Sequence, residues 1–330
     1  MILSFQSDKE ELTLYLRERG FIPPDQSVLS LEKPGEGNMN FVARVRTQSN
    51  SIIVKQANPY VQKYPHIQAP RERIFVEAEF YKVIKKYNNL SASMPFFIGL
   101  DEKNYILVLE DLGTSSDFTF LYQKGKELSK TELSELVQFL NELHTIPFDE
   151  LKSYPSNLGL RKLNHEHLFI YPFAEDNGFD LNKIQQGLQE LAMTYKTQKE
   201  FKSKTGKLGD IYLSEGSTLL HGDFYPGSWL KTRTRLKIID PEFSYAGRKE
   251  FDLGIFMAHL KMSEAANQHL DWVASHYETG QQFDWNLCYQ FLGIEIMRRI
   301  IGLAQLPFDL TLEEKEKLLK QAHQYIMKGA

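Results

Sequence analysis

The segment His221-Gly-Asp-Phe-Tyr-Pro-Gly-Ser228 has the highest density of residues that could do chemistry. Asp223 follows a short apolar stretch and lies in a loop bounded by Gly and Pro, which would hold its carboxylate rigidly at a cleft. Such a carboxylate can accept a proton from a substrate hydroxyl or orient that hydroxyl for attack. We expect His221 to brace the loop through a hydrogen bond to the backbone. The alternative is an Asx turn in which Asp223 only caps the turn.

A second acidic segment, Ile238-Ile-Asp-Pro-Glu242, follows shortly after. Its two β-branched residues put Asp240 at the end of a strand, and Pro241 stiffens the turn that projects Glu242 beside it. Two carboxylates so close repel each other unless a cation lies between them. Mg²⁺ commonly binds one or two carboxylates together with phosphate oxygens and waters. We therefore predict that Asp240 and Glu242 bind Mg²⁺, with an exposed acidic turn as the alternative.

Two further elements precede these loops. Lys55 lies on a predicted strand, where kinases place a lysine that holds nucleotide phosphates and pairs with a glutamate of the following helix. Glu77 is the natural partner on the predicted helix 71–87, because Glu79 points about 200° away from it. The turn Gly35-Glu-Gly-Asn-Met-Asn40 could bring backbone N–H groups close to phosphates. By itself that turn indicates only a hairpin.

The elements that must position these residues fall into two parts. Residues 8–20 predict an amphipathic helix that ends at Gly20. Period-two patterns then predict strands over 28–31, 41–46 and 51–56, and two more over 96–99 and 105–110. Residues 58–70 contain three prolines and are interpreted as a loop, and 71–87 as a helix. The connector Glu110-Asp-Leu-Gly113 would follow the fifth strand.

Beyond the connector the pattern is mainly helical. A capping box at Ser129 to Glu132 begins one helix, and further helices are predicted over 181–196, 249–262, 264–278, 285–305 and 312–328. Short strands interrupt this series at 218–240, and the basic stretch 196–207 is interpreted as a loop or a solvated face. The sequence thus predicts an α+β protein with an antiparallel-sheet lobe, residues 1–112, and a mainly helical lobe, residues 113–330.

Composition excludes several classes of protein. The chain has 330 residues, of which 42% are hydrophobic and 25% charged, so it is neither disordered nor fibrous. Its net charge of −4 provides no general attraction for nucleic acid. Cys288 is the sole cysteine, so no intrachain disulfide can form. No secretory signal or membrane-spanning run is recognised, and we expect a cytoplasmic protein that binds neither nucleic acid nor membrane.

The order of these elements is that of the kinase-like fold: Gly-rich turn, strand Lys, helix Glu, connector, Asp loop, metal Asp. In that order, the chain resembles the aminoglycoside phosphotransferase/choline kinase superfamily, and within it most of all the methylthioribose kinases. The strings that carry this resemblance are Gly37-Asn-Met-Asn-Phe-Val, Ile53-Val-Lys-Gln-Ala-Asn-Pro-Tyr, Leu109-Glu-Asp-Leu, His221-Gly-Asp-Phe-Tyr-Pro-Gly-Ser, Ile239-Asp-Pro-Glu-Phe and Arg298-Arg-Ile-Ile-Gly-Leu-Ala. In two places the chain departs from the family: the loop 61–70 lacks the usual Trp, and Tyr225 stands where a His is usual.

The resemblance implies a two-lobed kinase-like fold that uses ATP and Mg²⁺ to phosphorylate a small hydroxylated substrate, most simply a sugar. It implies that Asp223 is the catalytic carboxylate and that Asp240 and Glu242 bind the metal. Nucleotide contacts would come from Gly35, Gly37, Asn38, Asn40, Lys55, Glu77, Glu110 and Leu112. Substrate contacts would come from Arg298, Arg299, Tyr225 and Ser228.

Several alternatives stay open. Arg298 and Arg299 lie in an apolar helix, where Glu295 could pair with either of them instead of leaving them for the substrate. The acceptor could also be an aminoglycoside or an amino alcohol such as choline, although these cations call for an acidic pocket. A non-catalytic pseudokinase is a third reading, and the sequence leaves open whether the chain forms a homodimer.

Three other residues invite a functional reading. His165 and His167 could suggest a metal site, but they have no clustered third ligand, so a surface loop is the simpler interpretation. His259 on an apolar helix is expected to be a buried histidine with satisfied hydrogen bonds.

Overall fold

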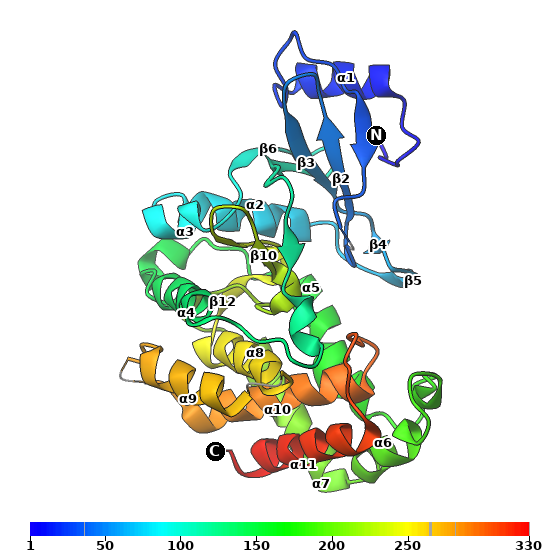
Figure 1. The fold of residues 1–330 in the computed structure, drawn as a ribbon, viewed down its shortest axis with the longest axis vertical. Coiled ribbons are helices and arrows are strands. Elements are labelled where there is room, and N and C mark those ends of the chain that lie inside the picture. The colour runs from blue at the N-terminus through cyan, green and yellow to red at the C-terminus, as the bar shows by residue number, and fades with distance from the viewer. Residues whose placement is uncertain (36, 264–265, 281, 330) are drawn as a thin grey trace.

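The fold is known from a computed structural model that describes residues 1–329 apart from 36, 264, 265 and 281. A strand-rich lobe lies at one end of the molecule and a larger helical lobe at the other, as Figure 1 shows. The predicted two-lobed α+β architecture is therefore confirmed. Across the described ranges, no helix is long and apolar enough to cross a bilayer.

The N-terminal lobe is built on a five-stranded antiparallel sheet with the order β1-β2-β3-β7-β6. Its strands are β1 (Ser30–Glu32), β2 (Phe41–Arg46), β3 (Ser51–Gln56), β6 (Phe97–Asp101) and β7 (Ile106–Glu110). Strand β3 lies at the centre, where Lys55 faces Val42 of β2 on one side and Leu107 of β7 on the other. The predicted strands are present in this lobe, and β3 coincides with its predicted range.

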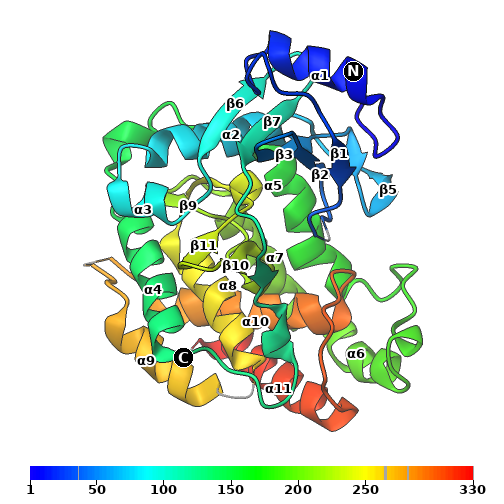
Figure 2. The same ribbon diagram turned by 45° about the horizontal axis from the view of Figure 1, so that its top comes forward.

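The two faces of this sheet belong to different cores, because side chains alternate along each strand. Ile52 and Val54 of β3 pack with α1 (Lys9–Glu18), which Asp8 caps. Leu107 and Leu109 of β7 instead join the main core with α2 (Arg73–Ile84). Figure 2 shows α1 and α2 on opposite sides of the strands. Lys55 lies on the α2 side, as a lysine that pairs with that helix must.

The segment 58–70 is not the loop that its prolines predicted. It contains a two-stranded hairpin of β4 (Tyr60–Val61) and β5 (Tyr64–Gln68). Pro65 is exposed on β5, which pairs with β4 alone, so its missing N–H costs no ladder bond inside a larger sheet. The hairpin extends from the strand lobe on the side that faces the helical lobe (Figure 1).

The rest of the chain is mainly helical. The helices are α3 (Asn88–Ala92), α4 (Lys130–His144), α5 (Leu158–His165), α6 (Leu188–Lys196), α7 (Lys199–Leu213), α8 (Lys249–Lys261), α9 (Ala266–His276), α10 (Trp285–Ile301) and α11 (Leu312–Lys328). A single π-helical turn, Glu166–Ile170, continues α5. In one small sheet, β10 (Trp229–Lys231) pairs with both β11 (Leu236–Ile238) and β8 (Ser116–Asp117). In another, β12 (Tyr245–Gly247) pairs with β9 (Thr218–Leu220).

Most predicted helices are present, with three differences. The basic stretch 196–207 was predicted as a loop or solvated face, but most of it belongs to α7, which buries Phe201, Leu208 and Tyr212. Over 181–196 a 3-10 turn precedes a shorter helix, and α10 ends at Ile301 rather than 305. The first two residues of the predicted helix 264–278 lie outside the described residues. The capping box predicted for α4 is present, with Ser129 as the N-cap.

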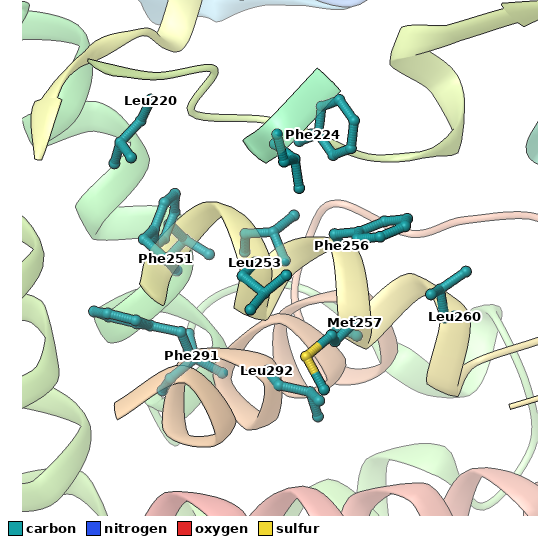
Figure 3. Close-up of a cluster of buried hydrophobic side chains, with 14 of the residues drawn as sticks. Leu220, Phe224, Phe251, Leu253, Phe256, Met257, Leu260, Phe291 and Leu292 are labelled. Carbon is teal, nitrogen blue, oxygen red and sulfur yellow. The ribbon is translucent and has the colours of Figure 1, made fainter. Parts of the chain in front are cut away.

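The core beneath the helical lobe's loops is rich in aromatic side chains. Figure 3 shows Phe251, Leu253 and Phe256 of α8 between Phe291 of α10 and Phe224 of the central loop. Phe224 is fully buried and stacks 5.8 Å from the ring of Phe139, with the two planes 3° apart. Because Phe224 directly follows Asp223 in the chain, this core anchors the loop in which Asp223 lies.

Candidate active site

The loop that carries Asp223 is fixed by its own backbone geometry. Gly222 has φ +83°, and a Cβ there would lie 2.2 Å from the carbonyl oxygen of Phe243, so no other residue fits. The Nε2–H of His221 donates to the carbonyl oxygen of Ile239 at 2.9 Å, which confirms the predicted brace. This bond ties the loop to the residue just before Asp240. The two acidic segments are therefore held side by side.

Asp252 of α8 is a second brace that sequence reasoning missed. Its carboxylate accepts hydrogen bonds from the backbone N–H of His221 at 2.6 Å and of Gly222 at 2.9 Å. His144 of α4 lies 3.3 Å from the same carboxylate. Asp252 is fully buried within an apolar helix, and a buried carboxylate must find donors. That mismatch between residue type and helix pattern was the available signal.

The side chain of Asp223 is directed toward two arginines. Its Oδ1 lies 3.6 Å from Nη2 of Arg299 and 4.0 Å from Nη1 of Arg298, and 21% of the side chain is exposed. Burial raises the pKa of this carboxyl, while the two arginines oppose that shift. Among the described residues, the Asp223 side chain accepts no hydrogen bond from its own loop. An Asx turn is therefore not what the carboxylate makes.

The predicted alternative for the arginine pair, an ion pair with Glu295, is present, and the substrate role of the two arginines stays a prediction. Glu295 is fully buried and accepts from Arg299 and, at 3.1 Å, from Arg298. His259 also contacts Glu295, 3.1 Å away, and lies 2.8 Å from the hydroxyl of Tyr122. His259 is thus the satisfied buried histidine that the sequence predicted. Glu295 positions the two guanidinium groups, and their other sides reach Asp223.

Lys55 lies between two carboxylates. Its Nζ donates to Glu77 at 2.6 Å, as predicted, and also contacts Asp240. The pKa of Glu77 is raised to about 7, chiefly because burial disfavours its charge. The Asp240 side chain is 46% exposed and its backbone is left-handed, with φ +63°. Asp240 therefore faces open space while Glu77 lies behind Lys55.

Glu242 is placed differently from Asp240. Its Oε2 accepts a hydrogen bond from Nδ2 of Asn40 at 3.0 Å and lies 3.3 Å from Nε of Arg73. Arg73 is fully buried and also donates to Oδ1 of Asn40 and to the carbonyl oxygens of Met39, Asn58 and Pro70. Arg73 is not among the residues that the sequence predicted for the site. We call the set Arg73, Asn40 and Glu242 the arginine latch.

The charges around Lys55 leave room for a cation. Among the described residues, three carboxyl groups, those of Glu77, Asp240 and Glu242, lie around the Lys55 ammonium, and Arg73 lies beside Glu242. Within the described residues, no group of three or more acidic, His or Cys side chains is arranged to hold a metal by itself. Phosphate oxygens and waters would have to complete the coordination, which is usual for Mg²⁺. The exposed Asp240 fits such a metal, whereas Glu242 is already engaged by the latch.

A pocket on one side of Asp240 is lined by residues predicted for the nucleotide. Gly35, Gly37, Lys55, Glu110 and Leu112 all line it, together with Asp240 itself. The connector at its rim is fixed by Arg44, which donates to both carboxylate oxygens of Asp111 at 2.7 and 2.9 Å. This pocket is called the β-lobe pocket below.

A second pocket contains Asp223. It is lined by Arg298, Arg299 and Tyr225, three of the four residues predicted for the substrate. Tyr225 lies under Arg299, whose guanidinium carbon is 4.9 Å from the ring centroid. We call this cavity the Asp223 pocket. Val61, Lys63, Tyr64 and Ile67 of the β4–β5 hairpin line it from the other lobe.

Three predicted site residues occupy unexpected places. Asn38 was predicted for the nucleotide but lines the Asp223 pocket. Asn40, predicted for the same role, is buried in the latch. Ser228 was predicted for the substrate but is buried and donates to the carbonyl oxygen of Asp223 at 3.0 Å, so it supports the loop from behind. The local sequence could not distinguish these roles. All three residues lie in short loops or turns, where a shift of one position along the chain changes the direction in which a side chain points.

Comparison with known proteins agrees with this geometry. No family model matches the chain. A methylthioribose kinase from Bacillus mycoides (strain KBAB4) is 24% identical in an alignment that is 359 residues long. The alignment covers 96% of this chain and 89% of that protein. Among solved structures, a choline kinase from Streptococcus pneumoniae has a TM-score of 0.54 at 16% identity, covering 96% of this chain and 99% of the other. An AMP-bound spectinomycin phosphotransferase also has a TM-score of 0.54, at 11% sequence identity, and the match covers 98% of this chain and 99% of the other.

The chain thus has the kinase-like fold of this choline kinase and this spectinomycin phosphotransferase. Its sequence is similar over nearly its whole length to the methylthioribose kinases, and these similarities together indicate an ATP-dependent small-molecule kinase.

Proposed function

We propose that this kinase transfers the γ-phosphoryl group of ATP to a hydroxyl of a small sugar, with methylthioribose as the first candidate. The observation that supports this most is that the acidic loops lining two separate pockets are joined by a hydrogen bond. Lys55 and Asp240 line the β-lobe pocket, Asp223 and two arginines line the Asp223 pocket, and the His221–Ile239 bond holds the two acidic loops together. ATP would occupy the first pocket and the sugar the second.

The chemistry asked of this chain is modest, because phosphoryl transfer depends chiefly on positioning and charge. The acceptor oxygen forms a bond to the γ-phosphorus while the bond from that phosphorus to the bridging oxygen breaks, and ADP leaves. Asp223 orients the acceptor hydroxyl and takes its proton. Lys55, freed from Asp240, would hold phosphate oxygens, and Glu77 would keep its ammonium in place.

Mg²⁺ would be held by Asp240, and when bound it would neutralise phosphate charge. Glu242 would join it only by releasing Asn40 and Arg73, so we propose Asp240 as the principal protein ligand and Glu242 as a secondary one. The boundary between the lobes is proposed at residues 112 and 113, where Arg44 also donates to the carbonyl oxygen of Gly113.

The charge of the Asp223 pocket favours a sugar over a cationic acceptor. Three of its lining residues, Lys63, Arg298 and Arg299, are cations, and Asp223 is the one carboxylate among the lining residues of the described chain. A quaternary ammonium or an aminoglycoside would meet like charge there, which disfavours binding. The cations suit a neutral polyol or an anion. The charge of the pocket therefore favours a sugar over a choline-type substrate.

The test is a phosphorylation screen with ATP and Mg²⁺ against methylthioribose, ribose, other pentoses, choline and aminoglycosides. Product formation with one of the sugars alone is expected. Turnover of choline or an aminoglycoside in preference to every sugar would contradict the proposed acceptor class. If no compound is phosphorylated although ATP binds, the non-catalytic reading is favoured instead.

A further inference from the structure

One wall of the Asp223 pocket carries polar side chains with no role so far. Leu163 and Asn164 at the end of α5 and His167 in the π-helical turn all line this cavity. Asn164 and His167 are three residues apart on a helical segment, so their side chains lie on one face. Single π-helical turns occur frequently at functional sites. The polar side chains of this segment are therefore candidates for binding a ligand in the Asp223 pocket.

In the described structure, the side-chain amide of Asn164 forms a hydrogen bond through its nitrogen but not through its oxygen. The residue is only 5% exposed, and its Nδ2 donates to the hydroxyl of Tyr212 at 3.1 Å. Tyr212 belongs to α7 and is itself buried. No hydrogen bond to Oδ1 occurs in the part of the chain that the structure describes. The amide is thus held in one orientation, and its carbonyl oxygen can still accept a hydrogen bond.

His167 lies within the π-helical turn, whereas its neighbour His165 is the last residue of α5. His165 packs against α7, where a Cβ on Gly209 would lie 2.4 Å from its Nε2. His167 instead lines the Asp223 pocket, with its ring centroid 5.4 Å from that of Tyr171. Neither ring nitrogen of His167 has a hydrogen-bond partner among the described residues. The prediction of a surface loop for this pair is therefore wrong.

The imidazole of His167 is suited to bind a neutral group. Burial lowers its pKa, and the nearby charge of Arg298 lowers it further. The ring is therefore uncharged at neutral pH and offers one N–H donor and one acceptor nitrogen. A hydroxyl group can satisfy either of them.

We propose that Asn164 and His167 form an acceptor subsite that binds hydroxyls of the sugar other than the one phosphorylated. This inference rests on the proposed function, because it assigns the same pocket. An acceptor must then carry several hydroxyls on a small ring. An amino alcohol with one hydroxyl could not satisfy both side chains, so the subsite adds to the selectivity that the arginines provide.

Binding rather than turnover is the primary readout. Titration calorimetry would measure the affinity of methylthioribose, ribose, 2-deoxyribose and choline for the wild-type protein and three variants. His167→Phe keeps an aromatic ring but removes both nitrogens, and Asn164→Leu removes the acceptor oxygen. His165→Phe is the matched control, because that ring packs away from the pocket.

We expect His167→Phe and Asn164→Leu each to weaken the binding of the sugar by roughly three- to tenfold, the loss of one neutral hydrogen bond. ATP affinity should be unchanged, and His165→Phe should bind the sugar like the wild type. A sugar that lacks the contacted hydroxyl should lose no further affinity in the variant. Asn164→Leu also removes the bond to Tyr212, so His167→Phe decides the case if that variant does not fold.

Wild-type sugar affinity in both folded variants would overturn the subsite, as would an equal loss of ATP affinity. The outcomes separate this inference from the proposed function. If the wild type phosphorylates a sugar but the variants bind it normally, the subsite alone fails. If the variants weaken binding of a sugar that is never phosphorylated, the subsite holds and the proposed reaction fails. If the wild type binds none of the sugars, both are refuted.

Discussion

The arginine latch allows a strong prediction about stability. Replacing Arg73 by Met keeps most of the apolar stem and removes the charge and every donor. Glu242 and Asn40 would then be left buried without the partner that they share, and the carbonyl oxygens of Met39, Asn58 and Pro70 would each lose a donor. Removing one partner of a buried pair typically costs about 3–5 kcal/mol. Domains are stable by only about 5–15 kcal/mol, so the loss is a large fraction.

The direction of the pKa shifts adds a second expectation. Burial lowers the pKa of Arg73 and raises that of Glu242, so for each group the desolvation exceeds the attraction of its partner. A pair of this kind costs more to break than it contributes intact. The double variant Arg73→Met/Glu242→Gln should therefore be more stable than Arg73→Met alone, because the stranded carboxylate is gone.

The assay is urea denaturation at pH 7 followed by far-ultraviolet circular dichroism. Arg46→Met is the matched control, since it breaks an exposed pair with Glu32 at 2.8 Å in the same lobe, where side chains are 48% and 42% exposed. Exposed pairs contribute little, so its denaturation midpoint should stay close to that of the wild type. A loss below about 1 kcal/mol for Arg73→Met, or a double variant no better than the single one, would refute the reasoning.

Four further predictions concern the site. Asp223→Asn should lower turnover by roughly a hundredfold or more and leave the affinity for ATP unchanged. Because burial raises the folded-state pKa of the Asp223 carboxyl, its negative charge destabilises the folded protein at neutral pH, and the variant should not be less stable than the wild type. A variant that melts clearly below the wild type would contradict this. For the same reason, kcat/KM of the wild type should fall as pH drops through a midpoint above the ordinary aspartate value of 3.8, and an acid limb at or below that value would show that the carboxyl is not shifted. ATP should raise the melting temperature more with Mg²⁺ than without it, and Asp240→Asn should remove that difference; equal shifts in the wild type would count against the metal. Arg298→Lys and Arg299→Lys keep the charge but lose the forked donors, so KM for the sugar should rise while KM for ATP holds, whereas a change in melting temperature alone would mean that the pair only packs the helix.

The sequence predicted the elements whose patterns are local. Strand β2 alternates between buried and more exposed residues along its whole length, and its ends match the predicted range 41–46. The hairpin at 58–70 was missed because Pro59 and Pro65 argue against a strand, and an isolated two-stranded ribbon tolerates proline where a central strand does not. Helix α7 was missed because lysines separate its apolar residues, although Phe201, Leu208 and Tyr212 repeat at helical spacing.

The site was predicted where one segment carries the chemistry by itself. His221 and Asp223 occur in one loop. Lys55 lies on a strand and Glu77 on the following helix, which is the arrangement found in kinases. Asp252 and Arg73 could not be found in this way. The loop that Asp252 braces begins 31 residues before it, and Asn40, which Arg73 joins to Glu242, lies 33 residues before Arg73. Their partners meet only in the tertiary structure, and a buried charge in an apolar helix is the single trace that this leaves in sequence.

The β4–β5 hairpin has a consequence for how the two substrates influence each other. The chain leaves Lys55, builds one wall of the Asp223 pocket and returns through α2 to Glu77. We therefore expect a ligand in either pocket to restrict the motion of the same short segment. Once the first ligand has reduced the conformational entropy of this segment, the second loses less when it binds. Thermodynamic linkage then requires that the factor by which ATP tightens sugar binding equals the factor by which the sugar tightens ATP binding.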